Sequence, residues 1–492
     1  MSLSAPPGSV GSPPELPDAA PTVPSGAAAT SRRAVPVALA LAAASLPMFM
    51  STLDNLVMTS ALPVIQPALD ASIEQLQWMM NSYTLAFATL MLAAATLGDR
   101  WGRRRVFLGG IAVFTLASIG SALATSSGAL IAARAIQGAG AAAIMPLSLT
   151  LLAAAVPVSR RAMAIGVWGG VSGLGVALGP VIGGAVVDGF SWQAIFWLNV
   201  PVAVVAVPLI LRALPESHGR RAPLDVRGLA LVGAGVLAAV WGIVRANELG
   251  WSSATVLVSL AGGAALIGAF IWHEGRTEHP LVPLRLFRSR SFSVANVTSL
   301  AFTLGMFGAV FLLAQYLQIV GGYTPLEAGI RTLPWTAAPM IVAPIAGLIA
   351  PRVGVRVLLA TGLTFQALGL TWLALLVTST TAYTELIPGF ILAGIGMGLT
   401  FAPSATAVLA DMAPDDHATA SSTNSTIREI GVALGVAVLV AVFQANGGSL
   451  TPTGYDEGLR AAILTGAGVV AIGAIATRWI PKGTGRAIPA TP

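Results

Sequence analysis

The pentapeptide GVALG occurs at residues 175–179 and again at residues 431–435. The six-residue segment DRWGRR at 99–104 has a looser copy at nearly the same spacing, PRVGVR at 351–356, which keeps the glycine and two arginines but loses the acidic residue. Two further matches recur at the first spacing: Gly138 with Gly394, and Gly140 with Gly396. The chain therefore contains an internal duplication.

Apolar residues dominate the sequence around these repeats. The chain has 492 residues, of which 55% are hydrophobic and 9% are charged, whereas soluble domains carry about 25% charged residues. Crossing a bilayer takes about 20 mostly apolar residues. Runs of this kind predict fourteen helices, near residues 35–62, 76–97, 106–124, 128–153, 162–187, 194–212, 228–245, 253–272, 292–320, 329–350, 355–377, 385–410, 421–443 and 459–479.

The duplication assigns these helices to two halves. Because the repeat spacing contains an even number of predicted helices, the halves are parallel and not inverted, and a binding site is expected near the midplane between them. We predict an all-α membrane protein with a 6 + 2 + 6 arrangement, in which the seventh and eighth helices are an insertion. The expected segments are a disordered tail (1–33), a first half (34–215), two inserted helices with linkers (216–290), a second half (291–480) and a second tail (481–492).

The basic residues predict the orientation. With a cytoplasmic N-terminus, 21 of the 26 Lys and Arg residues fall on the inner side, three (Arg245, Arg331, Arg460) on the outer side, and two (Arg134, Arg428) within helices. Cytoplasmic loops of membrane proteins carry such an excess of positive charge. We therefore expect both termini in the cytoplasm. The net charge of +6 then reflects topology, and no nucleic-acid partner is expected.

Several classes of chemistry are excluded. The chain has no cysteine, so thiolate metal sites and cysteine nucleophiles are absent. No phosphate-binding GxxxxGK[ST] motif occurs, and the single lysine is Lys482, in the tail. We expect no cofactor, no metal and no enzymatic activity. An ion gradient or a substrate gradient must then supply the energy for transport.

Asp54 and Arg134 are charged residues inside predicted apolar helices. An intramembrane carboxylate is by default a functional hypothesis, and proton relays use such groups. Arginine cannot lose its proton at accessible pH, so Arg134 is predicted to be a fixed positive charge that tunes a nearby carboxylate. The alternatives are an Asp54 in an outer loop and an Arg134 that extends to a membrane surface.

Arg428 and Glu429 lie deep in the thirteenth predicted helix, and we expect both, like Asp54 and Arg134, to belong to the proton-coupling or substrate site. The duplication places Glu429 opposite Gly173 of the fifth helix, so an acidic group replaces a small residue. Adjacent residues on a helix do not face each other. We therefore expect separate partners for the two charges, and a mutually neutralised pair is the alternative.

Further polar residues and glycines in the helices are candidates for a cavity and a hinge. The cavity candidates are Asn81, Tyr83, Gln137, Gln315, Tyr316 and Gln318. Hydrogen bonding between helices accounts for them equally well. The hinge candidates in the fifth helix are Gly175, Gly179, Pro180 and Gly183. Glycine and proline weaken a helix, and close helix packing is the alternative role.

The segment GDRWGRRR at 98–105 joins the second and third helices. We predict a gating latch formed by Asp99, Arg100, Gly102, Arg103 and Arg104, in which Asp99 caps a helix N-terminus or pairs with an arginine in one conformation and releases it in another. A cluster that only sets the topology is the alternative.

These motifs together resemble the fourteen-helix drug:proton antiporters of the major facilitator superfamily, which are multidrug and antibiotic exporters of bacteria. The resemblance runs from about residue 36 to 480. The segments that carry it are LDNLVMTSALP (53–63), LGDRWGRRR (97–105), LIAARAIQGAG (130–140), GLGVALGPVIGG (173–184) and YTPLEAGIRTLPW (323–335). The chain departs from the family pattern at Ala95, where glycine is usual, and at Gln193, where arginine is usual.

The resemblance implies a major facilitator fold and proton-driven efflux of small hydrophobic drugs or antibiotics across the bacterial cytoplasmic membrane, by a protein that is functional as a monomer. It also implies that Asp54 and Glu429 take part in proton or substrate binding, and that Arg134 supports coupling. The helix-five signature favours export. A proton-coupled importer on the same fold is the first alternative, and a membrane enzyme or sensor is the second.

Overall fold

The computed structural model describes residues 2, 36–219, 223–413 and 416–482. The predicted tails, 1–33 and 481–492, lie outside these residues apart from Ser2, Pro481 and Lys482. The compact unit that begins at Pro36 is helical throughout its described part. It contains fourteen helices that are long and apolar enough to cross a membrane, as the sequence predicts. The boundaries between the predicted segments stay predictions.

The first half is built from seven helical elements that form six spans. They are α1 (Val37–Ala68), α2 (Ile73–Trp101), α3 (Arg103–Ala122), α4 (Ser127–Ala155), α5 (Val158–Gly189), α6 (Ala194–Trp197) and α7 (Asn199–Ala213). The inserted pair is α8 (Val226–Leu249) and α9 (Ala254–Glu274).

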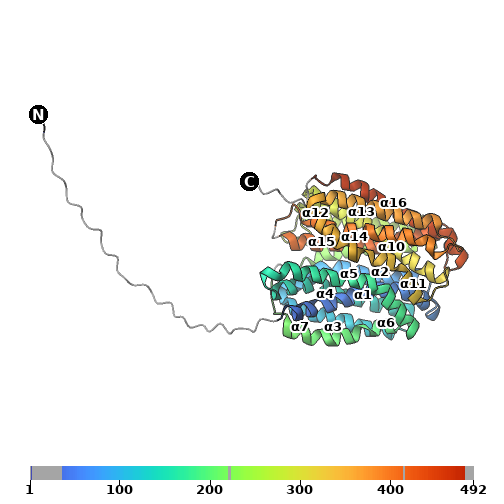
Figure 1. The fold of residues 1–492 in the computed structure, drawn as a ribbon, viewed down its shortest axis with the longest axis horizontal. Helices are drawn as coiled ribbons and strands as arrows, with labels where there is room; N and C mark the ends of the chain where they lie inside the picture. The colour runs from blue at the N-terminus through green and yellow to red at the C-terminus, as the bar shows by residue number, and fades with distance from the viewer. Residues whose placement is uncertain (1, 3–35, 220–222, 414–415, 483–492) are drawn as a thin grey trace. The chain divides into compact units, whose positions relative to one another are not determined.

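The second half repeats this order after a short 3-10 helix. Its elements are η1 (Leu284–Arg288), α10 (Arg290–Ile319), α11 (Pro325–Thr336), α12 (Ala338–Val353), α13 (Val355–Leu376), α14 (Tyr383–Leu409), α15 (His417–Ala445), α16 (Pro452–Ala476) and η3 (Thr477–Trp479). Figure 1 shows α10 and α12–α16 grouped apart from α1, α3, α4, α6 and α7.

Two predicted single helices are each broken in two. The sixth span divides between α6 and α7, and the tenth divides between α11 and α12. Pro201 and Pro339 follow these breaks, and a proline has no N–H to donate to the carbonyl four residues earlier. The helical hydrogen-bond ladder is therefore interrupted at both places.

Helix packing confirms the parallel repeat. The contact of α3 with α4 recurs as that of α13 with α14, and the contact of α1 with α5 recurs as that of α10 with α15. The halves touch each other through α5 with α11, α2 with α15, and α1 with α10. The two pairings α5–α11 and α2–α15 are equivalent under the repeat, and they form the two flanks of the interface between the halves.

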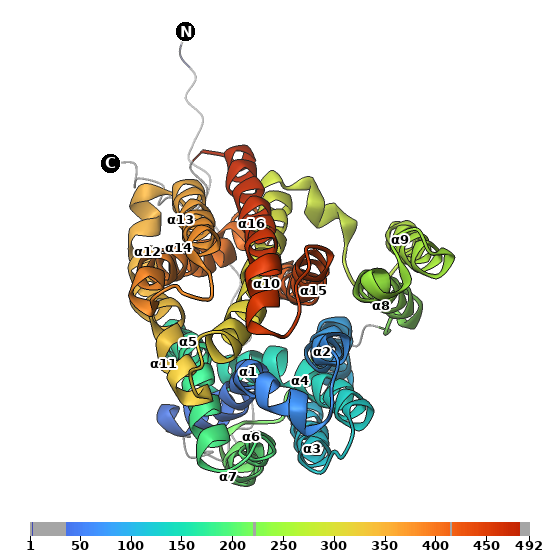
Figure 2. The same cartoon turned by 90° about the vertical axis from the view of Figure 1, so that its right-hand side faces the viewer.

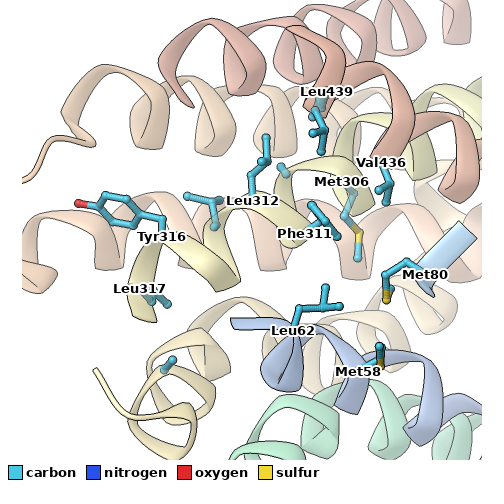
Figure 3. Close-up of a cluster of buried hydrophobic side chains, with 14 of the residues drawn as sticks. Met58, Leu62, Met80, Met306, Phe311, Leu312, Tyr316, Leu317, Val436 and Leu439 are labelled. Atoms are coloured by element: carbon cyan, nitrogen blue, oxygen red, sulfur yellow. The ribbon is translucent and has the colours of Figure 1, made fainter. Parts of the chain in front are cut away.

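The helix bundle has two ends that differ in their loops. The arginine-rich end holds the loop at Asp99–Arg105 and the linkers that precede α8 and α10, and the opposite end holds the loops that precede α2 and α11. Toward the opposite end the halves share a core of buried side chains. Figure 3 shows Met58, Leu62 and Met80 of the first half near Met306, Phe311 and Val436 of the second.

Candidate functional site

A buried ion pair lies at the centre of the first half. Asp54 stands near the middle of α1 and Arg134 on α4. The Arg134 Nη1 and Asp54 Oδ2 atoms are 2.5 Å apart, and the two side chains are 0% and 2% exposed. Asp54 therefore lies inside the protein and not in an outer loop, and Arg134 does not extend to a surface.

Two amides complete the surroundings of this carboxylate. Gln137 and Asn199 both donate to Asp54 Oδ1, at 2.9 and 2.8 Å. Asn199 also donates to the Ser118 hydroxyl at 2.9 Å, and Gln137 accepts from Arg134 at 2.9 Å. Removing a buried charge from water is costly unless it is paired and hydrogen-bonded. Asp54 therefore sits in a network that stabilises its negative charge.

The ring of Tyr83 covers the guanidinium of Arg134. The guanidinium carbon lies 4.3 Å from the ring centroid, within the range of a cation–π contact. Tyr83 also shares a hydrogen bond of 3.0 Å with the Ser51 hydroxyl of α1. A Cβ at position 138 would collide with the Tyr83 backbone carbonyl. Gly138 therefore allows α2 and α4 to approach closely enough for this stacking.

Glu429 is a carboxylate within a span of the second half. It lies on α15 and is partly buried, and its Oε2 atom is enclosed and has no hydrogen-bond partner in the described part of the chain. The adjacent Arg428 instead lies over the ring of Phe401, 4.5 Å from its centroid. The side chains of Arg428 and Glu429 therefore lie in different surroundings.

Glu429 stands where the contact between α2 and α15 ends. One turn after Glu429 on α15, Ala433 packs in a cluster with Leu85 of α2. Two turns after Glu429, Val436 belongs to the core that the halves share. In the other direction, one side of the helix continues from Glu429 through Thr426 to Ser422 by helical spacing. Ser422 lines a pocket.

This pocket is open toward the arginine-rich end and has a volume of about 930 Å³. Its walls come from α2, the start of α15 and the linker between α9 and α10. They include Leu92, Ala95, Thr96, Asp99, Glu274, Arg285, Thr419 and Ser422. A pocket of 300–1,000 Å³ is typical for drug-sized ligands. The α2–α15 flank is therefore closed toward the opposite end and open toward the arginine-rich end.

The α5–α11 flank has the same division. Toward the opposite end, a Cβ at Gly184 or Gly329 would collide with the backbone of the other helix, and Thr336 donates to the Ala177 carbonyl at 3.2 Å. The same face of α5 continues to Gly173 and Gly170 by helical spacing. No neighbouring described atom lies within 4 Å of where a Cβ would stand there.

The hinge candidates of α5 belong to the closed part. A Cβ at Gly175, Gly179 or Gly183 would meet Thr52, Leu56 or Val57 of α1, and the Pro180 carbonyl accepts a hydrogen bond from Ser60 at 3.1 Å. These residues hold α5 tightly against α1. Whether they also act as a hinge stays a prediction.

The cavity candidates occupy several places. Tyr83 and Gln137 belong to the network around Asp54. Asn81 is buried on α2, and neither amide atom has a partner among the described residues. Gln315 and Tyr316 are buried in α10, where they donate to the carbonyls of Phe311 and Thr378.

Gln318 lies at the contact between the halves. It donates to the Ser60 carbonyl at 3.1 Å and lines a cavity of about 20 Å³ beside Pro180 and Trp335. This space is sufficient for about one water molecule. Gln318 therefore belongs to the closed part of the interface.

The loop between α2 and α3 contains an ion pair. Asp99 accepts from Arg103 at 2.7 Å, and Arg100 is exposed. Gly102 has φ +107° and has no room for a Cβ beside the Glu216 carboxylate. Gly354, its counterpart in the second half, has φ +91°. The duplicated glycine therefore provides the same positive-φ turn in both halves.

Sequence reasoning missed two residues of these sites. Glu216, and not Asp99, caps α3: its carboxylate accepts from the backbone N–H groups of Arg104 and Arg105 at 2.9 and 3.3 Å. Asn199 was detectable as an amide in an apolar run, but its contact with Asp54, 145 residues away in sequence, follows only from helix packing.

Known proteins resemble this chain over most of its length. The model of the Major Facilitator Superfamily matches residues 44–436 and 297–490. The Mycobacterium tuberculosis protein named multidrug resistance protein Stp is 37% identical over 83% of this chain and 76% of its own length. The tetracenomycin C resistance and export protein of Streptomyces glaucescens is 33% identical over 85% of this chain and 78% of its own length.

A solved structure has the same fold. It is that of a bacterial homologue of the human lysosomal transporter Spinster, in an inward-facing and unoccupied conformation, with a TM-score of 0.67 and 18% identity over 92% of this chain and 99% of the other. The family match and the relatives at 33–37% identity make this protein a multi-pass transporter and not an enzyme. The chain belongs to the Major Facilitator Superfamily of secondary transporters.

Proposed function

We propose that this protein exports small hydrophobic compounds across the bacterial cytoplasmic membrane in exchange for protons, by alternating access between its two halves. The observation that carries this proposal is the position of Glu429. It is an intramembrane carboxylate without an ion-pair partner in the described chain, and it stands at the boundary between the closed and open parts of the interface.

The direction of transport follows from the proposed orientation. The arginine-rich end lies in the cytoplasm, in accordance with the excess of positive charge there. The open flanks then face the cytoplasm, and the shared core closes the outer side. A substrate enters from inside, and rocking of the halves exposes it to the outside. One chain contains both halves, so it works as a monomer.

The two carboxylates have different tasks in this proposal. Glu429 exchanges a proton for substrate, because a neutral carboxyl group is far less costly at an apolar boundary than an unpaired charge. Asp54 is held by Arg134, Gln137 and Asn199 and couples proton binding to the packing of α1 against α4. The substrate class is supported by the relatives, whose names include multidrug resistance and tetracenomycin C export.

The test is efflux of a fluorescent lipophilic cation from cells, with and without a protonophore. We expect wild-type efflux to be abolished by the protonophore. Glu429→Gln and Asp54→Asn should remove the protonophore-sensitive part, because each substitution eliminates a titratable group. Glu248→Gln is the matched control, since Glu248 is 59% exposed and lies 3.6 Å from Arg245 at the opposite end.

Each outcome has a definite meaning. Protonophore-sensitive efflux that persists in Glu429→Gln would contradict the assigned role of Glu429. Accumulation of the probe above the level in cells that lack the protein would indicate the importer alternative. The variants must reach the membrane in the same amount as wild type, which immunoblotting checks.

A further inference from the structure

The inserted helix α8 is attached to both halves. Arg245 of α8 pairs with Glu74 of α2 at 3.1 Å, and Asn247 donates to the Ala441 carbonyl of α15 at 2.6 Å. Nearer the start of α8, Val236 and Val240 share a buried cluster with residues of both neighbouring helices. α8 therefore covers the α2–α15 flank.

The linker after α9 borders the same flank at the arginine-rich end. Glu274, 3% exposed, accepts from the backbone N–H of Val282 at 2.9 Å and so holds the linker. Arg285 pairs with Asp416 through two hydrogen bonds of 2.5 and 2.6 Å. The linker thus runs from the inserted pair to the start of α15, along the wall of the 930 Å³ pocket.

Toward the arginine-rich end, the α5–α11 flank continues between α5 and α12, and we call this part the α5–α12 flank. It has no such cover in the described chain. Positions 166, 170 and 173 of α5 are open, and so is position 347 of α12. Exposed apolar side chains lie beside them, including Leu174 on α5 and Leu348 on α12, which is 79% exposed. Figure 2 shows α8 and α9 beside α2 and α15, on the far side of the bundle from α5 and α11.

We infer that the inserted helices make substrate entry one-sided: lipophilic substrates enter the space between the halves from the bilayer through the α5–α12 flank, while α8 and the linker exclude lipid from the α2–α15 flank. The fold alone offers two equivalent entrances, because the repeat relates the flanks. The insertion covers one of them. This inference rests on the proposed export of hydrophobic compounds.

The chemistry of the substrate favours this route. A lipophilic compound is concentrated in the hydrocarbon layer by the transfer of its apolar surface out of water. The α5–α12 flank presents glycines and aliphatic side chains at that depth. The pocket beside the covered flank is instead lined by Asp99, Glu274 and Glu278 among others, and it opens to water.

Spin-label accessibility tests this without any transport measurement. The chain has no cysteine, so single labels can be placed at Gly166→Cys and Gly347→Cys, and at their repeat equivalents Ser422→Cys and Ala95→Cys, in protein reconstituted in lipid nanodiscs. We expect oxygen, which is enriched in the bilayer, to relax the first pair of labels more strongly. A water-soluble nickel chelate should relax the second pair more strongly. Equal oxygen accessibility on the two flanks would overturn the inference.

A second measurement concerns the substrate route itself. Gly347→Trp narrows the open flank, and Gly268→Trp makes the same enlargement on α9, beside the covered flank, where a Cβ has open space around it. We expect the association rate of a fluorescent lipophilic cation added to nanodiscs to fall about tenfold in Gly347→Trp, with a smaller change in Kd, because access limits association. Gly268→Trp should leave this rate unchanged.

The result separates the inference from the proposed function. If Gly268→Trp slows association as much as Gly347→Trp does, entry is not one-sided and the inference fails, whatever the efflux assay shows. If the flanks differ in accessibility but protonophore-sensitive efflux is absent, the proposed proton coupling fails and the asymmetry of the flanks stands.

Discussion

Gly138 in the first half and Gly394 in the second make the same close contact. A Cβ at position 138 would collide with the backbone carbonyl of Tyr83, and one at position 394 would collide with that of Trp335. The contact of Gly140 with Phe114 likewise recurs as that of Gly396 with Gln366. The duplicated backbone therefore packs in the same way in both halves.

The side chains around these contacts differ in charge. Arg134 lies over Tyr83 in the first half, whereas Phe390 stacks on Trp335 with ring centroids 5.9 Å apart in the second. Gly175 meets Thr52, and its equivalent Gly431 meets Thr303, so Asp54 corresponds to Gly305, which packs against the Gly466 carbonyl of α16. A charged network in one half is thus an apolar contact in the other.

The second carboxylate shows the reverse relation, because Glu429 of the second half stands opposite Gly173 of the first. Asp54 and Glu429 therefore each stand where the other half has glycine. The two halves share their backbone contacts but carry these charges at different places. The glycine contacts are therefore the same in both halves, although the buried charges are not.

The largest expected effect is the loss of the positive charge. Arg134→Leu should destabilise the protein by about 3–5 kcal/mol, because it leaves the buried Asp54 carboxylate without its ion-pair partner. Phe390→Leu at the equivalent place should cost only ~1 kcal/mol. Thermal unfolding of the purified protein in detergent measures both. Adding Asp54→Asn to Arg134→Leu should recover part of the lost stability. If Arg134→Leu and Phe390→Leu were equally stable, the charged network would contribute no more than the apolar contact at the equivalent place.

The shared backbone contact predicts similar effects in both halves. Gly138→Ala and Gly394→Ala should each destabilise by about 1–3 kcal/mol, since the added methyl group overpacks a helix crossing. Gly109→Ala on α3 has open space around it and should be neutral or stabilising by up to ~1 kcal/mol. The same unfolding assay applies. A large effect in one half alone would contradict the equivalence of the two crossings.

Asn199 offers a smaller test of the charged network. Asn199→Leu removes the donor to Asp54 Oδ1 and to the Ser118 hydroxyl, and losing it should cost about 1–2 kcal/mol. We also expect a lower maximal efflux rate with a nearly unchanged half-saturating substrate concentration, because the substitution disturbs Asp54 and not the walls of the 930 Å³ pocket. Asn446→Leu, at an exposed position, is the control. Unchanged efflux in Asn199→Leu would remove Asn199 from the network.

The smallest expected effect concerns the ion pair between Arg285, in the linker between α9 and α10, and Asp416 at the start of α15. The guanidinium of Arg285 holds the pKa of Asp416 below its usual range. Stability from this pair is therefore present above the unfolded pKa of about 3.9 and is lost as the pH falls through the lower folded pKa. The Arg285 side chain is 61% exposed, so the contribution of the pair is at most about 1 kcal/mol.

Unfolding of wild type and Asp416→Asn between pH 7 and pH 3 measures this contribution. The difference between the two proteins should shrink only at the acidic end of the range. A difference that is constant down to pH 3 would show that Asp416 acts by packing and not through its charge.

The sequence predicted the fourteen spans and the parallel repeat because both depend on patterns along the chain: apolar runs of membrane-spanning length and recurrent glycines. It also identified Asp54, Arg134 and Glu429 as charges within spans, although their roles in coupling stay predictions. It did not predict which carboxylate Arg134 contacts, nor the parts played by Asn199 and Glu216. These contacts join residues 80 to 145 positions apart, and only the packing of helices determines them.

The attachment of α8 to both halves restricts how those halves can rotate. A helix bound to α2 at Glu74 and to α15 at Ala441 cannot follow two bodies that separate widely at its own position. In the alternating-access movement proposed above, a rotation of the halves that preserves both attachments turns about an axis close to α8. Displacement grows with distance from such an axis, so α5 and α12, on the far side, should travel furthest in each transport cycle.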